Sequence, residues 1–143
     1  MRGLHEDYEL VSDQGRIDPV AAHAYLTRSY WAEGIPLDTV KRAITNSLCV
    51  AIFRGDEQIA FARIISDSAT FAYLADVYVL EEHRDKGLSH VMLEHLDAHP
   101  KLQGLRRWML ATQDAQSLYV SHGWSQYPFP ERMMTRNYPD IYR

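Results

Sequence analysis

Apolar residues recur every three or four positions in four stretches of the chain, and this spacing predicts four helices. The pair Asp18-Pro19 places a capping residue before a proline at a first helical position, so the first helix is predicted from there to about Tyr30. Its inward stripe is predicted to be Val20, Ala24 and Leu26. The other helices are predicted at residues 37–44, from residue 88 to the breaker Pro100, and at residues 115–122 before Gly123.

Seven stretches rich in β-branched and aromatic residues predict strands, at residues 8–12, 48–53, 59–65, 71–80, 108–112, 124–127 and 133–138. The sequence Arg54-Gly55-Asp56-Glu57 is a short hairpin connection between the second strand and the third. The element order is therefore β-α-α-β-β-β-α-β-α-β-β. This order predicts a mixed α/β (α+β) fold with a central mixed sheet of about seven strands, not a regular run of βαβ units.

Composition narrows the class of protein. The 143 residues, 46% of them hydrophobic and 24% charged, predict one domain over residues 1–143 with its own core. A net charge of −4 disfavours partnership with nucleic acid, and no apolar run is long enough for a membrane span. The single cysteine, Cys49, is expected to be a small core residue and suits a reducing cytoplasm. His95 and His99 lack a third ligand, so we expect no metal.

The loop at residues 79–89 joins a buried strand to the start of a helix and carries two basic residues, Arg84 and Lys86. Free backbone N–H groups in a first helical turn attract anions, and Gly87 lets a ligand approach the backbone closely. The loop therefore predicts an anion site that would fit a diphosphate. The alternative is an ordinary capped helix start with a routine glycine.

These residues also carry a resemblance to a known family. Val79 followed by Arg84-x-x-Gly87-x-Ser89 resembles the coenzyme A loop of the GNAT superfamily of N-acetyltransferases. The pattern departs from the family at Glu81, where proline is frequent, and at Ser89, which replaces the last small residue. Residues 114–124, a short helix containing Tyr119 and ending in Gly123-Trp124, resemble the second signature of the same family.

The resemblance implies that coenzyme A lies in a wedge between the two central strands, around residues 77–80 and 108–112. Backbone groups near Val77 and Val79 would bind the pantetheine arm. The pyrophosphate would lie on the backbone amides of Arg84, Asp85, Lys86, Gly87, Leu88 and Ser89. Asp114, at the start of the second signature, is assigned to the cofactor as well.

Candidate catalytic residues follow from the same resemblance. Tyr119 would donate a proton to the departing thiolate, and its alternative role is packing on the sheet. Asp76 is the acidic residue of an otherwise largely apolar strand, so it either contacts the substrate amine or its activating water, or makes a structural hydrogen bond. Tyr73 is a weaker candidate on that strand. Tyr30 and Trp31 either belong partly to the core or form a rim pocket for the acceptor.

The function predicted from these observations is an acetyl-CoA-dependent N-acetyltransferase that moves an acetyl group to a primary amine of a small molecule or peptide by direct attack. The runner-up is a non-catalytic acyl-CoA-binding regulatory module, which has no need of a proton donor at Tyr119. The predicted C-terminal strand at residues 133–138 could supply an edge for a homodimer.

Overall fold

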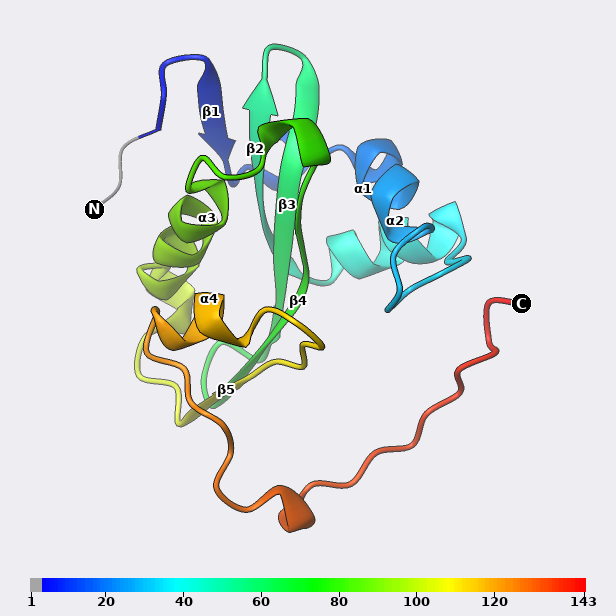
Figure 1. Cartoon of the computed structure of the whole chain (residues 1–143), viewed down its shortest axis with the longest axis vertical. Coiled ribbons are helices and arrows are strands. Elements are labelled where there is room, and N and C mark those ends of the chain that lie inside the picture. The colour runs from blue at the N-terminus through cyan, green and yellow to red at the C-terminus, as the bar shows by residue number, and fades with distance from the viewer. Residues whose placement is uncertain (1–3) are drawn as a thin grey trace.

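The computed structural model describes residues 4–143, and this part of the chain forms one five-stranded mixed sheet (Figure 1). The strands follow chain order across the sheet: β1 (Tyr8–Val11), β2 (Leu48–Arg54), β3 (Glu57–Ser66), β4 (Phe71–Val79) and β5 (Arg107–Met109). Neighbours are antiparallel from β1 to β4, whereas β4 and β5 are parallel. β5 therefore forms one edge of the sheet.

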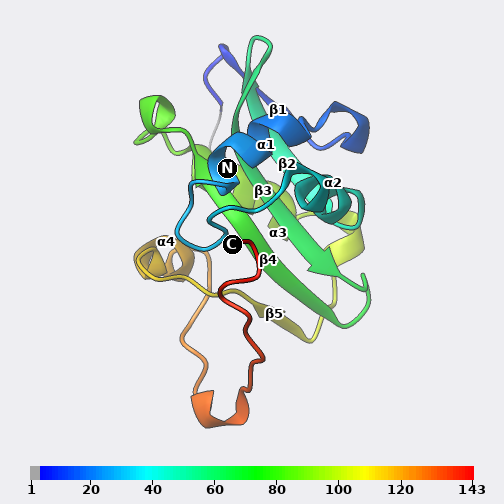
Figure 2. The ribbon, with the colours of Figure 1, turned by 90° about the vertical axis from the view of Figure 1, so that its right-hand side faces the viewer.

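Helices cover both faces of the sheet. α1 (Pro19–Leu26) and α2 (Leu37–Thr45) pack on one face, α3 (Leu88–Asp97) packs on the other, and α4 (Gln116–Val120) lies beyond the end of β5 (Figures 1 and 2). Short 3₁₀ helices lie at Gln14–Arg16, Glu81–His83, Pro100–Leu102 and Pro130–Arg132. No helix within residues 4–143 is long and apolar enough to cross a membrane.

Two hydrophobic clusters fill the space on either side of the sheet, because side chains alternate between the faces of a strand. The cluster against α3 includes Val50, Ile52, Ala62, Ile64, Leu74, Met92 and Leu96. The cluster against α1 and α2 includes Leu26, Val40, Ile44, Ala51 and Phe61. Cys49 belongs to the second cluster and is 4% exposed, as expected of a core residue.

The start of α1 confirms its predicted cap, but of the predicted inward stripe only Leu26 is buried, whereas Val20 and Ala24 are exposed. Asp18 accepts hydrogen bonds from the N–H groups of Val20 and Ala21, with Pro19 at the first helical position. The buried residues are Ala22 and Leu26, whereas Val20 is 58% exposed. The buried side chain of Gln58 on β3 holds both backbone groups of Asp18, so a tertiary contact helps to set how the helix is turned.

The prediction of about seven strands is wrong, since the described residues form five. Residues 124–127 and 133–138 are not strands, and every residue from 128 to 143 is exposed. A strand requires a partner for its N–H and C=O groups, and these segments leave the sheet without acquiring one. Pro128, Pro130 and Pro139, which flank these segments, also lack backbone N–H donors.

Candidate active site

The ladder between β4 and β5 is short, and a cavity lies beside β4 beyond the point where the ladder ends. Register partners run from Phe71 opposite Arg107 to Tyr73 opposite Met109, and pairing stops there although β4 continues to Val79. Beyond that point β4 and the segment after β5 are no longer paired. A cavity of about 680 Å³ opens beside the second half of β4, lined by α1, the segment after it, the loop before α3, and α4.

A β-bulge marks the same part of β4. The register with β3 shifts between Phe61 and Arg63, and Asp76 has a φ of +57°. After the bulge, the N–H of Leu80 donates to the carbonyl of Ile59 on β3. Because alternate residues of a strand direct their backbone groups to opposite sides, Val77 and Val79 direct theirs toward the cavity.

The loop before α3 presents its backbone to the same cavity. Asp85 and Gly87 have φ values of +64° and +75°, so the chain turns sharply into the helix. No side chain of the described residues caps the first amides of α3. These amides and the positive end of the helix dipole suit an anionic group. Lys86 is exposed and does not line the cavity.

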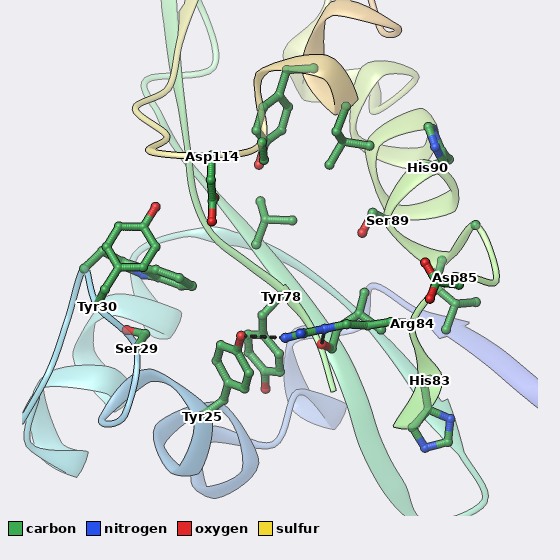
Figure 3. Close-up of a pocket in the computed structure, with 18 of the residues that line it drawn as sticks. Tyr25, Ser29, Tyr30, Tyr78, His83, Arg84, Asp85, Ser89, His90 and Asp114 are labelled. Atoms are coloured by element: carbon green, nitrogen blue, oxygen red, sulfur yellow. Dashed lines mark hydrogen bonds between the residues drawn. The ribbon is translucent and has the colours of Figure 1, made fainter. Parts of the chain in front are cut away.

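Two walls face each other across the cavity (Figure 3). Tyr25, Ser29 and Tyr30 form one wall, while Arg84, Asp85 and Ser89 form the other. One hydrogen bond spans them, from Arg84 Nη2 to the Tyr25 hydroxyl at 3.0 Å. Arg84 Nε also donates to the carbonyl of Val79 at 2.9 Å, which leaves the Val79 N–H as the group directed at a ligand.

Stacked side chains stiffen the first of these walls. The Tyr25 ring lies parallel to the ring of Tyr78 at 4.1 Å, and the Arg28 guanidinium lies 4.4 Å from the Tyr25 centroid on the aromatic surface. Arg28 in turn pairs with Glu81 at 2.8 Å. Burial raises the pKa of the Tyr78 phenol well above its ordinary value, so this ring stays neutral.

Tyr119 projects from α4 and lines this cavity as well as a second one along β5. It is 9% exposed, and its ring packs against Trp124. Burial, with smaller contributions from Tyr30 and Asp114, raises the pKa of the Tyr119 phenol to about 12. Within residues 4–143 no hydrogen bond engages its hydroxyl, which is not sealed from solvent. Tyr119 is thus a protonated donor at neutral pH.

Asp76 lies outside the cavity lining, but it is hydrogen-bonded to Trp31, a residue of that lining. Asp76 Oδ2 is 2.6 Å from Arg63 Nε, and Asp76 Oδ1 accepts a hydrogen bond of 2.8 Å from the Trp31 indole. The side chains of Asp76 and Arg63 are 10% and 17% exposed. Trp31 itself lines the cavity, so Asp76 is connected to the cavity only through its hydrogen bond to that ring.

The cavity brings together most of the residues predicted from sequence. The predicted residues that line it are Val77, Val79, Arg84, Asp85, Gly87, Leu88, Ser89, Asp114, Tyr119, Tyr30 and Trp31. Three predicted residues lie outside the lining: Asp76, Lys86 and Tyr73. The lining also contains Tyr25, Arg28 and His83, which were not predicted as site residues from the sequence. Their signal was weak, because Tyr25 and Arg28 stand in a helical stretch and His83 belongs to a charged run. No group of three or more metal-ligating side chains assembles anywhere in residues 4–143.

The fold thus combines a short parallel ladder between β4 and β5 with a cavity at its end and a helix start that no side chain of the described residues caps. The family model of the GNAT acetyltransferase domain matches residues 45–126. A Gibberella zeae protein, named as a candidate acetyltransferase, is 32% identical over 136 residues, which cover 79% of this chain and 76% of its own.

Solved structures agree. A Xanthomonas campestris pv. campestris protein, described as a candidate acetyltransferase of the GNAT family, is 46% identical with a TM-score of 0.91, covering 94% of this chain and 96% of its own. Arabidopsis thaliana glucosamine-6-phosphate N-acetyltransferase shares the fold alone, at 13% identity and a TM-score of 0.62 over 93% of this chain and 99% of its own.

The chain belongs to the GNAT acetyltransferase family. Members of this family take the acetyl group from acetyl-CoA and act on amines.

Proposed function

We propose that this chain, as a single domain, transfers an acetyl group from acetyl-CoA to a primary amine of a small molecule or peptide. One observation carries the proposal. The unpaired side of β4 at Val77 and Val79 and the uncapped start of α3 at Gly87 open into one cavity. An extended amide-containing arm that ends in a diphosphate needs this combination, because strand amides bind the arm and helix amides bind the phosphates.

The donor would lie with its diphosphate on the amides from Arg84 to Ser89 and its pantetheine arm along Val77 and Val79. Arg84 adds positive charge beside the phosphates, and the Asp85 side chain is exposed, so its carboxylate can turn to solvent. Asp114 lies across the cavity (Figure 3), near the reacting end of such an arm.

The reaction needs no covalent acyl-enzyme. The neutral amine attacks the thioester carbonyl, a C–N bond forms, the C–S bond breaks, and the thiolate leaves while the amine nitrogen loses a proton. Cys49 cannot serve as a nucleophile, because it is buried in the core and burial raises the pKa of its thiol to about 12.

Tyr119 is proposed to assist the departing thiolate. A phenol with a pKa of about 12 is a weak acid beside a thiol of pKa about 8.5, so complete proton transfer would be uphill by about 5 kcal/mol. A hydrogen bond from the hydroxyl to the developing thiolate avoids that cost. The phenol keeps its proton throughout: coenzyme A leaves as the thiolate, and the proton lost by the amine nitrogen goes to water.

The acceptor would approach from the wall formed by the segment after α1. Trp31 and Tyr30 present 41% and 57% exposed rings there, and such surfaces favour amines that carry positive charge before deprotonation. Asp76 would orient the Trp31 ring instead of acting as the base, since both of its oxygens already accept hydrogen bonds.

The deciding experiment measures coenzyme A thiol release from acetyl-CoA across a panel of amino acids, polyamines, aminoglycosides and peptides, with acetyl-CoA binding followed by calorimetry. We expect binding and thiol release that depends on one class of amine. Binding without release for any amine would favour the non-catalytic acyl-CoA-binding module. Absence of binding would overturn both functions.

The lone buried cysteine suits a reducing compartment, and we propose the cytoplasm as the place of action.

A further inference from the structure

The arginines that line the candidate active-site cavity lie at one of its ends. Arg84 belongs to the loop before α3, and Arg28 pairs at 2.8 Å with Glu81 in the same loop. Both arginines thus flank the end at which the diphosphate would lie. The other end contains one carboxylate among the described lining residues, that of Asp114 just before α4, and no lysine or arginine (Figure 3). A cationic group is therefore attracted to that end of the cavity.

The Asp114 carboxylate is not used by the fold. Within residues 4–143 it takes part in no hydrogen bond or ion pair, and α4 begins without a side-chain cap. Asp114 lines the cavity and is exposed to solvent. Its charge is therefore available to a ligand.

Two aromatic side chains lie close to this carboxylate. The N–H of Gln113 donates to the Tyr30 hydroxyl at 3.2 Å, which places the Tyr30 ring beside the segment that carries Asp114 (Figure 3). The Trp31 ring meets the Tyr30 ring at a centroid distance of 5.1 Å with the ring planes 81° apart. Asp114 and Tyr30 both help to raise the pKa of the Tyr119 phenol, so they lie near that hydroxyl. We call Tyr30, Trp31 and Asp114 the aromatic–acid corner.

The aromatic–acid corner has the chemistry of a cation site, because aromatic faces and a carboxylate both attract positive charge. The cation it suits is not the nitrogen that reacts. A carboxylate beside an amine raises the pKa of that amine and favours the ammonium form, whereas only the neutral amine attacks the thioester. The corner therefore suits a second positive charge on the acceptor, at a distance from the attacking nitrogen.

We propose that the acceptor is an aliphatic diamine or polyamine whose second ammonium group lies in the aromatic–acid corner and donates a hydrogen bond to Asp114. This inference rests on the proposed acetyl transfer, and it assigns Asp114 to the acceptor instead of the cofactor. One amine nitrogen forms the C–N bond and loses its proton to water as the thiolate leaves, while the other nitrogen stays protonated. Amino acids and phosphorylated amino sugars are disfavoured, because their anionic groups would face the Asp114 carboxylate.

The first test uses putrescine, butylamine and γ-aminobutyrate, which share one chain length and end in an ammonium, a methyl and a carboxylate group. The same three end groups are also tested on chains one carbon shorter and one carbon longer. The wild-type preference for the diamine over the monoamine, measured as a ratio of kcat/KM for thiol release, should fall about tenfold in Asp114→Asn, through a higher KM for the diamine. The pKa values of the free amines cancel when the two enzymes are compared. An unchanged ratio overturns the inference and leaves the acetyl transfer standing, whereas no release with any amine overturns both.

The second test separates an acceptor role of Asp114 from a structural or cofactor role. Glu33→Gln removes an exposed carboxylate from the segment that carries Tyr30 and Trp31 but lies outside the cavity lining, and it should keep the wild-type preference. Asp114→Lys should shift the preference toward γ-aminobutyrate, a gain that a disturbed fold does not produce. Calorimetry should give the same acetyl-CoA affinity for Asp114→Asn as for the wild type. Weaker acetyl-CoA binding with an unchanged amine preference would assign Asp114 to the cofactor and refute the inference.

Discussion

Replacing Asp76 with Asn removes the negative charge from a largely buried ion pair while keeping the shape of the side chain. Asp76 Oδ2 lies 2.6 Å from Arg63 Nε, and the two side chains are 10% and 17% exposed. Asn tolerates the φ of +57° at this position, so the substitution adds little backbone strain. The Asn side chain can still accept the hydrogen bond from the Trp31 indole, which isolates the loss to the Arg63 guanidinium.

The expected destabilisation follows from that geometry. Removing one partner of a buried ion pair costs about 3–5 kcal/mol, because the other charge is left without compensation. Here the pair keeps some solvent, and Arg63 Nη1 also donates to Ser47 Oγ at 3.1 Å, so the lower end, about 3 kcal/mol, is expected. For a chain of this size that corresponds to a fall in Tm of about 6–12 °C.

A double-mutant cycle with Arg63→Met gives the control. Each single variant leaves one charge unpaired, whereas the double variant leaves none, so the two losses should be coupled by at least about 1.5 kcal/mol. The measurement is urea unfolding of all four chains. Losses that add to within about 0.5 kcal/mol would refute the buried-pair reasoning.

The same variant separates the two roles considered for Asp76. If it orients Trp31, Asp76→Asn should raise the KM for the acceptor and lower kcat by less than about tenfold, with the shape of the pH profile kept. If it is the general base, kcat should fall about 10²–10⁴-fold at saturating acceptor. The larger loss in kcat would refute the positioning role.

Three further predictions concern the site and the core. Tyr119→Phe should keep coenzyme A affinity and lower the single-turnover rate about 10- to 100-fold, the worth of one hydrogen bond to a charged group; an unchanged rate makes Tyr119 a packing residue. Gly87→Val should weaken coenzyme A binding in calorimetry, while Gly55→Val, which also has a positive φ but lies in open space, should not; equal affinities place the phosphates elsewhere. From pH 9 to pH 10 the contribution of Cys49 to the free energy of unfolding should fall by about 1 kcal/mol, since Cys49 ionises in the unfolded chain at its ordinary pKa and stays protonated in the folded chain until about pH 12. Urea unfolding of Cys49→Ala should show a flatter profile there, and an equally steep one would contradict the assignment.

Much of the site could be predicted from sequence because its donor side is made of neighbours in the chain. The amides of the loop before α3, Gly87 and the start of the helix lie within a few residues of one another, so their spacing alone indicates an anion site. The acceptor side could not be predicted in this way. Trp31 meets Asp76 and Tyr25 meets Arg84 across 45 and 59 residues, and no local pattern encodes such contacts.

By itself, the sequence determined the elements whose signals are local: the Asp18 cap of α1, the Gly55 turn, the stripe of α2 and the alternation of the inner strands. Only the tertiary structure decided which face of α1 is buried, where β5 stops pairing, and that residues 124–138 form no strand in the single chain. The physical reason is that helix caps and turns are satisfied within a few residues. A strand exists only where another segment accepts its hydrogen bonds, and no segment within residues 4–143 does so for residues 133–138.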